Sequence, residues 1–187
     1  MKRKKLVTVT ALAIGLATLA YRKKKHAEHR PHAVDQINLE RYLGQWYEIA
    51  HLPNYFQKTS STDTTASYRL NPDQTIAVKN RCLDPKGRVR IAQGTAYAQN
   101  KGKSELKVSF LPKGLKWLPC SKGDYWVLRI DPHYQTALVG DGAHKYLWLL
   151  SRTPTIAQDT YDSFIATAKE QGFPVEKLHR TQHTRSQ

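Results

Sequence analysis

Between residues 43 and 151 the chain alternates short runs rich in Thr, Val, Ile, Tyr and Ala with turn signals, and this alternation restricts its fold more than any other feature. Turn sequences such as Asn71-Pro72-Asp73 and Asn100-Lys101-Gly102 separate the runs. Runs of this length joined by tight turns are typical of antiparallel hairpins. The predicted strands cover residues 43–53, 62–70, 75–82, 88–99, 105–111, 125–131, 134–140 and 146–151.

Eight sequential strands can close on themselves. Closure removes the exposed sheet edges, and a barrel of this size has room for one small ligand. A chain of 187 residues is long enough for one such domain with a substantial core. The predicted fold is therefore all-β, an eight-stranded up-and-down antiparallel β-barrel.

After Pro154 the apolar pattern changes to a helical period. Ala157, Tyr161, Phe164, Ile165 and Ala168 share one face of a helix. We expect this C-terminal α-helix to pack against the outside of the barrel. Residues 173–178 are expected to add a short strand beside the first one, which gives a domain over 38–178 and a loose tail over 179–187.

The N-terminal 25 residues resemble an export signal or a membrane anchor. Residues 1–5 are basic, residues 6–21 carry no charge, and residues 22–25 are basic again. The uncharged run is slightly shorter than the ~20 residues that span a bilayer, but flanking lysines can reach the interface. A good cleavage site is missing, so the segment is predicted to remain attached as a membrane tether. The predicted location is periplasmic, and residues 26–37 are predicted to form a polar linker.

Histidines in the linker leave one alternative open. His26, His29 and His32 are three residues apart, and imidazole is a common metal ligand. No cysteine or carboxylate pair completes a site there, so a solvated linker is favoured and no metal or cofactor is predicted.

The net charge of +15 is unevenly distributed. Residues 1–30 contribute +8, from nine Lys/Arg and one Glu, and the remainder contributes +7, from 21 against 14. The basic residues of the body are dispersed, and no zinc-finger spacing or helical basic region accompanies them. Nucleic acid is therefore not expected as a partner.

Three short motifs carry a family resemblance. Gly44 and Trp46 form a Gly-x-Trp motif, Asp131 and Tyr134 form an Asp-x-x-Tyr turn, and Arg152 ends the last strand. In this order and spacing they resemble the signature blocks of the lipocalin family, and the flanking residues look like its bacterial branch, the outer-membrane lipoprotein type related to apolipoprotein D. The leader has no cysteine, so the lipid anchor of that branch is not expected.

The resemblance also orients the strands. Side chains alternate between the two faces of a strand, and in lipocalins the face of Trp148 lines the interior. The same parity predicts an apolar interior with a few polar tips, lined by Ala50, Ala66, Tyr68, Val78, Asn80, Ala92, Val108, Phe110, Tyr125, Val127, Tyr146 and Trp148. Any one of these positions could equally be plain core packing.

Two further side-chain pairings are predicted. Trp46 and Arg152 are expected to plug the closed end of the barrel, because a guanidinium suits a flat contact over an indole. Glu48 and Arg129 share the inward parity, so they form a candidate buried ion pair.

Cys82 and Cys120 fall in neighbouring connections, so a disulfide and two free thiols both remain open.

The predicted function is to hold a fatty acid or lysophospholipid in the barrel, which the resemblance links to envelope lipid maintenance or stress. The oligomeric state is not predicted. The chain contains no Gly-x-Ser-x-Gly, His-Glu-x-x-His or phosphate-loop motif, so an enzyme is not expected. The alternatives are an interaction protein with a filled barrel that binds partners through loops or its basic surface, and an isomerase for an apolar substrate.

Overall fold

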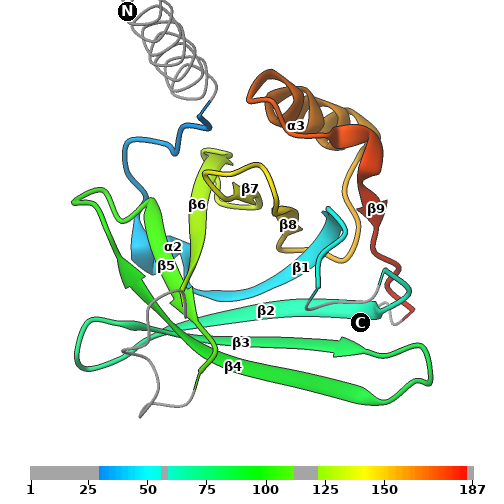
Figure 1. Cartoon of the computed structure of the whole chain (residues 1–187), viewed down its shortest axis with the longest axis horizontal. Helices are drawn as coiled ribbons and strands as arrows, with labels where there is room; N and C mark the ends of the chain where they lie inside the picture. Colours follow the sequence, from blue (N-terminus) through cyan, green and yellow to red (C-terminus); the bar gives the residue numbers. More distant parts are fainter. Residues whose placement is uncertain (1–29, 56–58, 112–121, 185–187) are drawn as a thin grey trace, which may run out of the picture. The chain divides into compact units, whose positions relative to one another are not determined.

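The computed structural model describes residues 30–55, 59–111 and 122–184. In these residues nine strands form one antiparallel sheet in the order β2-β3-β4-β5-β6-β7-β8-β1-β9, and β1 also pairs with β2. That extra pairing closes strands β1 to β8 into the predicted eight-stranded barrel (Figure 1). The strands are β1 (Gly44–His51), β2 (Thr62–Leu70), β3 (Ile76–Leu83), β4 (Val89–Ala98), β5 (Glu105–Ser109), β6 (Gly123–Ile130), β7 (Thr136–Gly140), β8 (Leu147–Ser151) and β9 (His179–Arg180).

In the residues that the structure describes, three helical segments accompany the barrel. They are α2 (Leu39–Tyr42), α3 (Gln158–Glu170) and the 3₁₀ helix η2 (Val175–Lys177). Asn38 caps α2, because its side-chain oxygen accepts a hydrogen bond from the Arg41 amide at 3.0 Å. We call the end of the barrel at which α2 lies the closed end. The open end is the opposite one, at which β1 and β3 terminate.

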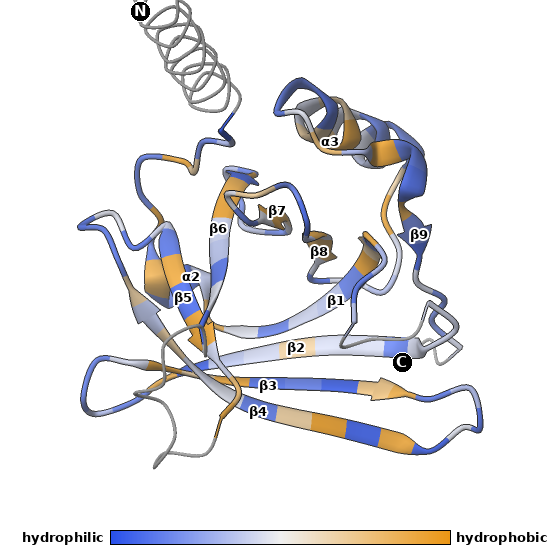
Figure 2. Cartoon of the chain, in the orientation of Figure 1, coloured by the Kyte–Doolittle hydropathy of each residue, from blue (hydrophilic) through white to orange (hydrophobic). Residues whose placement is uncertain are grey.

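The C-terminal helix α3 packs on the outer face, as predicted. Its Phe164 and Ala168 are buried in a cluster with Leu138 of β7 and Leu149 of β8. A separate cluster, which contains Trp46, fills the inner face. Figure 2 shows the mixed hydropathy of α3 that follows from having one buried face.

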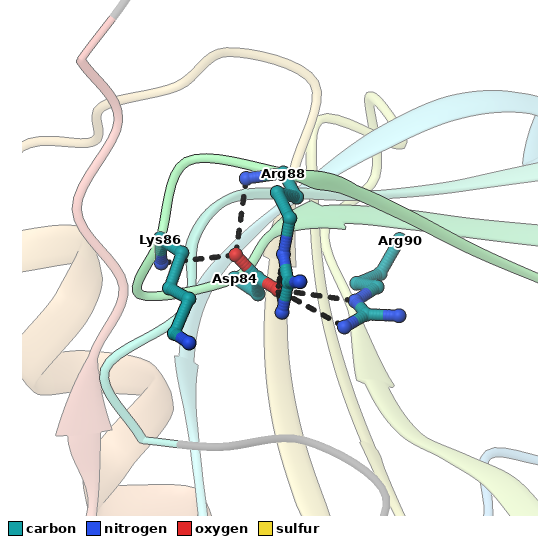
Figure 3. A network of polar contacts seen from close by, with 4 residues as sticks. All are labelled: Asp84, Lys86, Arg88 and Arg90. Atoms are coloured by element: carbon teal, nitrogen blue, oxygen red, sulfur yellow. Dashed lines mark hydrogen bonds and ion pairs between the residues drawn. The ribbon is translucent and has the colours of Figure 1, made fainter.

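The hairpin between β3 and β4 is closed by Asp84 (Figure 3). Its carboxylate accepts hydrogen bonds from the amides of Lys86 and Arg88 at 2.9 and 3.0 Å, and it pairs with the guanidinium groups of Arg88 and Arg90. These bonds, above all those from Arg88, hold the pKa of Asp84 well below its ordinary value. These contacts therefore favour the ionised form of the Asp84 carboxylate.

Up to residue 184, the C-terminal segment is packed on the barrel. The prediction of a loose tail over 179–187 is therefore wrong as far as residue 184. β9 pairs with β1, the Thr181 amide donates to Ile49 O at 2.9 Å, and the Asp63 amide donates to Gln182 O at 2.9 Å. The segment thus fills the gap between β1 and β2 at the open end. The predicted strand over 173–178 is displaced to β9, since 175–177 forms η2.

The end of the predicted linker is also packed on the barrel. The Val34 amide donates to Val127 O and the Ile37 amide donates to Gly102 O, both at 2.8 Å, and Ile37 is buried. The prediction of a polar linker over 26–37 is therefore wrong for the second half of that range. Among the described residues, no helix has the length and apolarity to cross a bilayer. The predicted anchor over 1–25 lies outside them, as do His26 and His29.

Candidate ligand-binding site

Trp46 and Arg152 plug the closed end, as predicted. The guanidinium carbon of Arg152 lies 3.8 Å from the centroid of the Trp46 ring. Its Nη1 donates to Gln45 O at 2.7 Å and its Nη2 donates to Leu43 O at 2.9 Å. Trp46 is fully buried, and its Nε1 donates to Tyr42 O at 2.8 Å. Charge and ring together therefore satisfy carbonyls that would otherwise be left without donors at this end.

The glycine of the first motif has a structural reason. Gly44 has φ +93°, a conformation that favours glycine, and a Cβ there would lie 3.4 Å from Arg152 Nη1. The Asp-x-x-Tyr turn belongs to the same assembly. The Asp131 carboxylate accepts from the amides of His133 at 2.8 Å and Gln135 at 2.7 Å, and Tyr134 O accepts from Arg152 Nε at 3.3 Å.

Above this plug, three tyrosine hydroxyl groups meet inside the barrel. The Tyr125 oxygen lies 2.7 Å from that of Tyr42 and 2.8 Å from that of Tyr68. Tyr68 and Tyr125 were predicted to line the interior. Tyr42 was missed because residues 38–43 read as a helical turn leading to the barrel, and nothing local shows that this turn points a side chain inward.

The three hydroxyl groups stay neutral over a wide pH range. Burial raises the pKa of Tyr42 and Tyr125 well above the ordinary value, and it raises the pKa of Tyr68 to about 12. Three O–H groups can donate three hydrogen bonds, and two are used within the trio. In the described part of the chain, one donor is therefore left for another group in the interior.

The interior becomes more exposed toward the open end. Tyr68 is 6% exposed, Val108 9% and Val127 0%, whereas Phe110 is 44% exposed. The Phe110 ring lies over Gly94, where a Cβ would come within 2.9 Å of it. Phe110 therefore covers the inner face of β4 while still meeting solvent.

Other residues of the inner face follow the same gradient. Trp46, Ala66, Asn80 and Ala92 are paired in register across β1, β2, β3 and β4, so they share the inner face. Ala66 and Asn80 are half-buried and Ala92 is exposed. The ring of Tyr146, just before β8, stacks on that of Trp148 in β8 with 5.8 Å between centroids, and both residues are half-buried.

A β-bulge in β1 overturns one predicted position. Glu48 pairs with Leu150 and Ala50 pairs with Leu149, so Ile49 is an extra residue. Ala50 is consequently buried in the outer cluster beneath α3 instead of lining the interior. The count of alternate residues fails here because one inserted residue reverses the parity of the rest of the strand.

A second irregularity breaks the predicted pair of Glu48 and Arg129. The register of β6 shifts between Val127 and Arg129, which moves Arg129 to the outer face. There it donates to Ser163 O at 2.7 Å and its guanidinium lies 4.1 Å from the centroid of the Phe164 ring. The ion pair was therefore wrong, because a bulge lies between the position from which parity was counted and the arginine.

Glu48 instead pairs with His51, near the open end. Glu48 Oε1 accepts from His51 Nδ1 at 2.8 Å, and Thr181 Oγ1 donates to the same oxygen at 2.5 Å. Both residues are buried, with His51 only 1% exposed. Sequence reasoning placed His51 in solvent because it ends a strand, and only the bulge and the C-terminal segment bring these groups together.

The remaining predicted positions are placed as follows. Val78 is buried in the inner cluster with Tyr68, Val108 and Val127. Cys82 is half-buried, and burial raises the pKa of its thiol. Cys120 lies outside the described residues, so the disulfide stays a prediction. Within 30–55, 59–111 and 122–184, no group of three His, Cys, Asp or Glu residues could hold a metal ion.

A depression on the outer surface is a different site. It has a volume of about 260 Å³ and is lined by Gln45, Tyr47, Asp63, Thr65, Arg81, Leu83 and His183. Gln45 and Tyr47 flank Trp46 in β1 and therefore face outward. Its mixed polar lining does not suit an apolar ligand.

Comparison with known proteins gives consistent results. The model of the Lipocalin-like domain family matches residues 37–183. The chain is 45% identical over 151 residues to temperature-induced lipocalin-1 of Arabidopsis thaliana, covering 79% of this chain and 80% of that protein. It is 40% identical over 149 residues to the outer membrane lipoprotein Blc of Vibrio cholerae, covering 78% and 82%. Insecticyanin of the tobacco hornworm Manduca sexta has the same fold, with a TM-score of 0.62 at 18% identity over 83% of this chain and 88% of that one.

Proposed function

The chain belongs to the lipocalin family, and from that premise we propose that it is a carrier that holds a single-chain lipid, a fatty acid or a lysophospholipid, inside the barrel. The observation that supports this most is the gradient along the inner face. Residues at the closed end are fully buried, whereas Ala92 and Phe110 on the same face meet solvent at the open end. A hydrocarbon chain that covers such a face removes apolar surface from water at about 25 cal/mol per Å².

The interior offers a chain an apolar wall with few polar groups. Phe110 and Ala92 contribute exposed apolar surface, and the half-buried Trp148 contributes an indole face. The donor left over in the tyrosine trio suits a carbonyl or another acceptor on the ligand. Apolar walls with a small number of placed polar groups are typical of small-molecule sites.

The location we propose is the cell envelope, with the N-terminal segment as a tether. One relative is named an outer membrane lipoprotein and another is named temperature-induced, which supports roles in envelope lipid maintenance or stress. Release of radiolabelled or tagged full-length chain from membranes by detergent, but not by high salt, tests the tether.

The test of the carrier role is lipid analysis of the purified full-length protein. We expect organic extraction and mass spectrometry to recover one lipid molecule per chain, and a fluorescent fatty acid to bind and be displaced by unlabelled lipid. An empty extract with no saturable binding would contradict the proposal and would favour an interaction protein with a filled barrel.

Adjacent residues of β4 provide a matched control. Ala92 faces inward and Ile91 faces outward, and both are exposed, so an indole can be added at either site without repacking the core. We expect Ala92→Trp to weaken lipid binding at least tenfold and Ile91→Trp to leave it unchanged. Equal effects of the two substitutions would place the lipid outside the barrel.

A further inference from the structure

The depression on the outer surface lies over β1, β2 and β3, whereas α3 packs over β7 and β8. The sheet register brings three of its side chains together. Tyr47 of β1 is paired with Thr65 of β2, and Thr65 is paired with Arg81 of β3. All three face outward, because Trp46 and Asn80 beside them face inward. Directly paired residues have their Cβ atoms about 5 Å apart, so these side chains form one continuous surface.

The hydrogen-bond donors of this depression are unused. Among the described residues, the side chains of Gln45, Tyr47, Thr65 and Arg81 make no hydrogen bond, and Arg81 belongs to none of the ion pairs. Arg81 is half-buried, so its guanidinium lies against the sheet. A guanidinium is always charged, and its rigid fork of N–H groups matches the oxygens of an anion. The depression therefore suits an anionic group.

One lining residue, Asp63, carries the opposite charge. Its Oδ1 accepts from the Thr184 amide at 2.8 Å and its Oδ2 accepts from Thr184 Oγ1 at 2.7 Å. Asp63 is 9% exposed, so it is engaged with the C-terminal segment beneath the surface. Lys79 is exposed on the same outer face, two residues from Arg81 along β3. The two cations outweigh this single carboxylate.

The number of donors favours a phosphate group over a carboxylate. The fork of Arg81, the hydroxyl groups of Tyr47 and Thr65 and the amide of Gln45 offer about six N–H and O–H donors, whereas a carboxylate accepts about four hydrogen bonds. A phosphate monoester has a third strong acceptor oxygen. The volume of about 260 Å³ leaves room for the group that is esterified to the phosphate. Ile91, which is paired with Arg81 and 53% exposed, adds apolar surface at the edge.

We propose that this outer depression is a binding site for a phosphate monoester. Arg81 makes a bidentate contact to the phosphate, and Tyr47, Thr65 and Gln45 donate the remaining hydrogen bonds. The site is independent of the carrier function, because its residues face away from the barrel interior. A free phosphate ester and the headgroup of phosphatidic acid present the same chemical group to it.

The first test titrates inorganic phosphate into the full-length protein and follows the arginine Nε–H resonances by NMR. We expect a saturable shift of the Arg81 resonance in wild type. Arg81→Gln should weaken phosphate binding about tenfold, the worth of a charge-assisted hydrogen-bond pair. Arg69→Gln is the matched control. Arg69 is exposed on the outer face of β2 but does not line the depression, so the same charge is removed outside the site.

The second test distinguishes the two sources of phosphate with phosphatidylcholine vesicles that contain or lack phosphatidic acid. The basic N-terminal segment contributes equally to both variants. Weaker binding of Arg81→Gln than of Arg69→Gln to phosphatidic acid vesicles would support the site and identify a lipid headgroup. Equal vesicle binding, with the loss of inorganic phosphate binding confined to Arg81→Gln, would support the site and identify a free phosphate ester.

Equal behaviour of the two variants in both tests would overturn the site, because only general charge would then be at work. An Arg81 resonance that does not respond to phosphate in wild type, together with equal vesicle binding, would also overturn it. Binding of a fluorescent fatty acid should be the same in Arg81→Gln as in wild type, since Arg81 faces outward. This readout keeps the fate of the phosphate site separate from that of the carrier function.

Discussion

The two ends of the barrel interior differ in how their polar groups are satisfied. At the closed end Arg152 donates to several main-chain carbonyls and Trp46 donates to Tyr42 O. Near the open end, among the residues that the structure describes, His51 Nε2 and Asn80 Oδ1 have no partner, and Phe110 meets solvent. The polar groups named at the closed end are satisfied within the protein, whereas the open end retains unsatisfied polar atoms and exposed apolar surface.

The largest effect is expected at the closed end. Arg152→Ala removes charge-assisted hydrogen bonds and the contact over Trp46, so we expect the free energy of unfolding to fall by about 3 kcal/mol. Urea denaturation measures it. Arg129→Ala is the matched control, because Arg129 also lies over a ring and donates to α3, but on the outer face. If both variants lose the same free energy, the closed end has no special weight.

Alkaline pH should act on the tyrosine trio between the two ends. The pKa of Tyr68 is about 12 in the folded protein against 10.0 for the free side chain. Between these values the unfolded chain has released a proton that the native state keeps, so stability falls as pH rises, by up to about 1.4 kcal/mol per pH unit for each such group.

Urea midpoints at pH 9, 10 and 11 measure this slope. Tyr68→Phe should flatten it, whereas Tyr55→Phe, at a position that is 95% exposed, should leave it as in wild type. A slope that is unchanged in Tyr68→Phe would mean that the trio takes up water in solution and is not sealed by the closed end.

The third effect should appear in binding. Trp148→Ala removes a half-buried indole from the inner face near the open end, and we expect the affinity for a fluorescent fatty acid to fall about tenfold, or about 1.4 kcal/mol. The exposed outer residue Ile91 provides the control as Ile91→Ala. A large loss of stability with unchanged affinity would mean that Trp148 is core packing like Trp46.

The smallest effect is expected where the C-terminal segment meets Glu48. Thr181→Val keeps the shape of the side chain and removes the hydrogen bond to Glu48 Oε1, which should cost about 1 kcal/mol of unfolding free energy. Thermal and urea denaturation measure it. A loss above 3 kcal/mol would show that the open end is as important for stability as the closed end.

Much of the interior was predictable from strand parity. Tyr68, Val78, Val108 and Val127 lie where alternation from the motif residues puts them, because each strand runs without interruption up to those positions. Ala50 and Arg129 were wrong because each follows a bulge. The plug of Trp46 and Arg152 was predictable from two motifs whose chemistry is complementary.

The barrel, the outer helix α3 and the plug could be predicted from the residues alone, because turn signals, period-two alternation and an arginine opposite an indole are local or pairwise features. The group formed by Glu48, His51 and Thr181 could not be predicted in this way. Its members are up to 133 residues apart, and they meet because a one-residue bulge turns His51 inward and the C-terminal segment fills the gap between β1 and β2. Such a bulge depends on register with distant strands, which no local pattern of residues specifies.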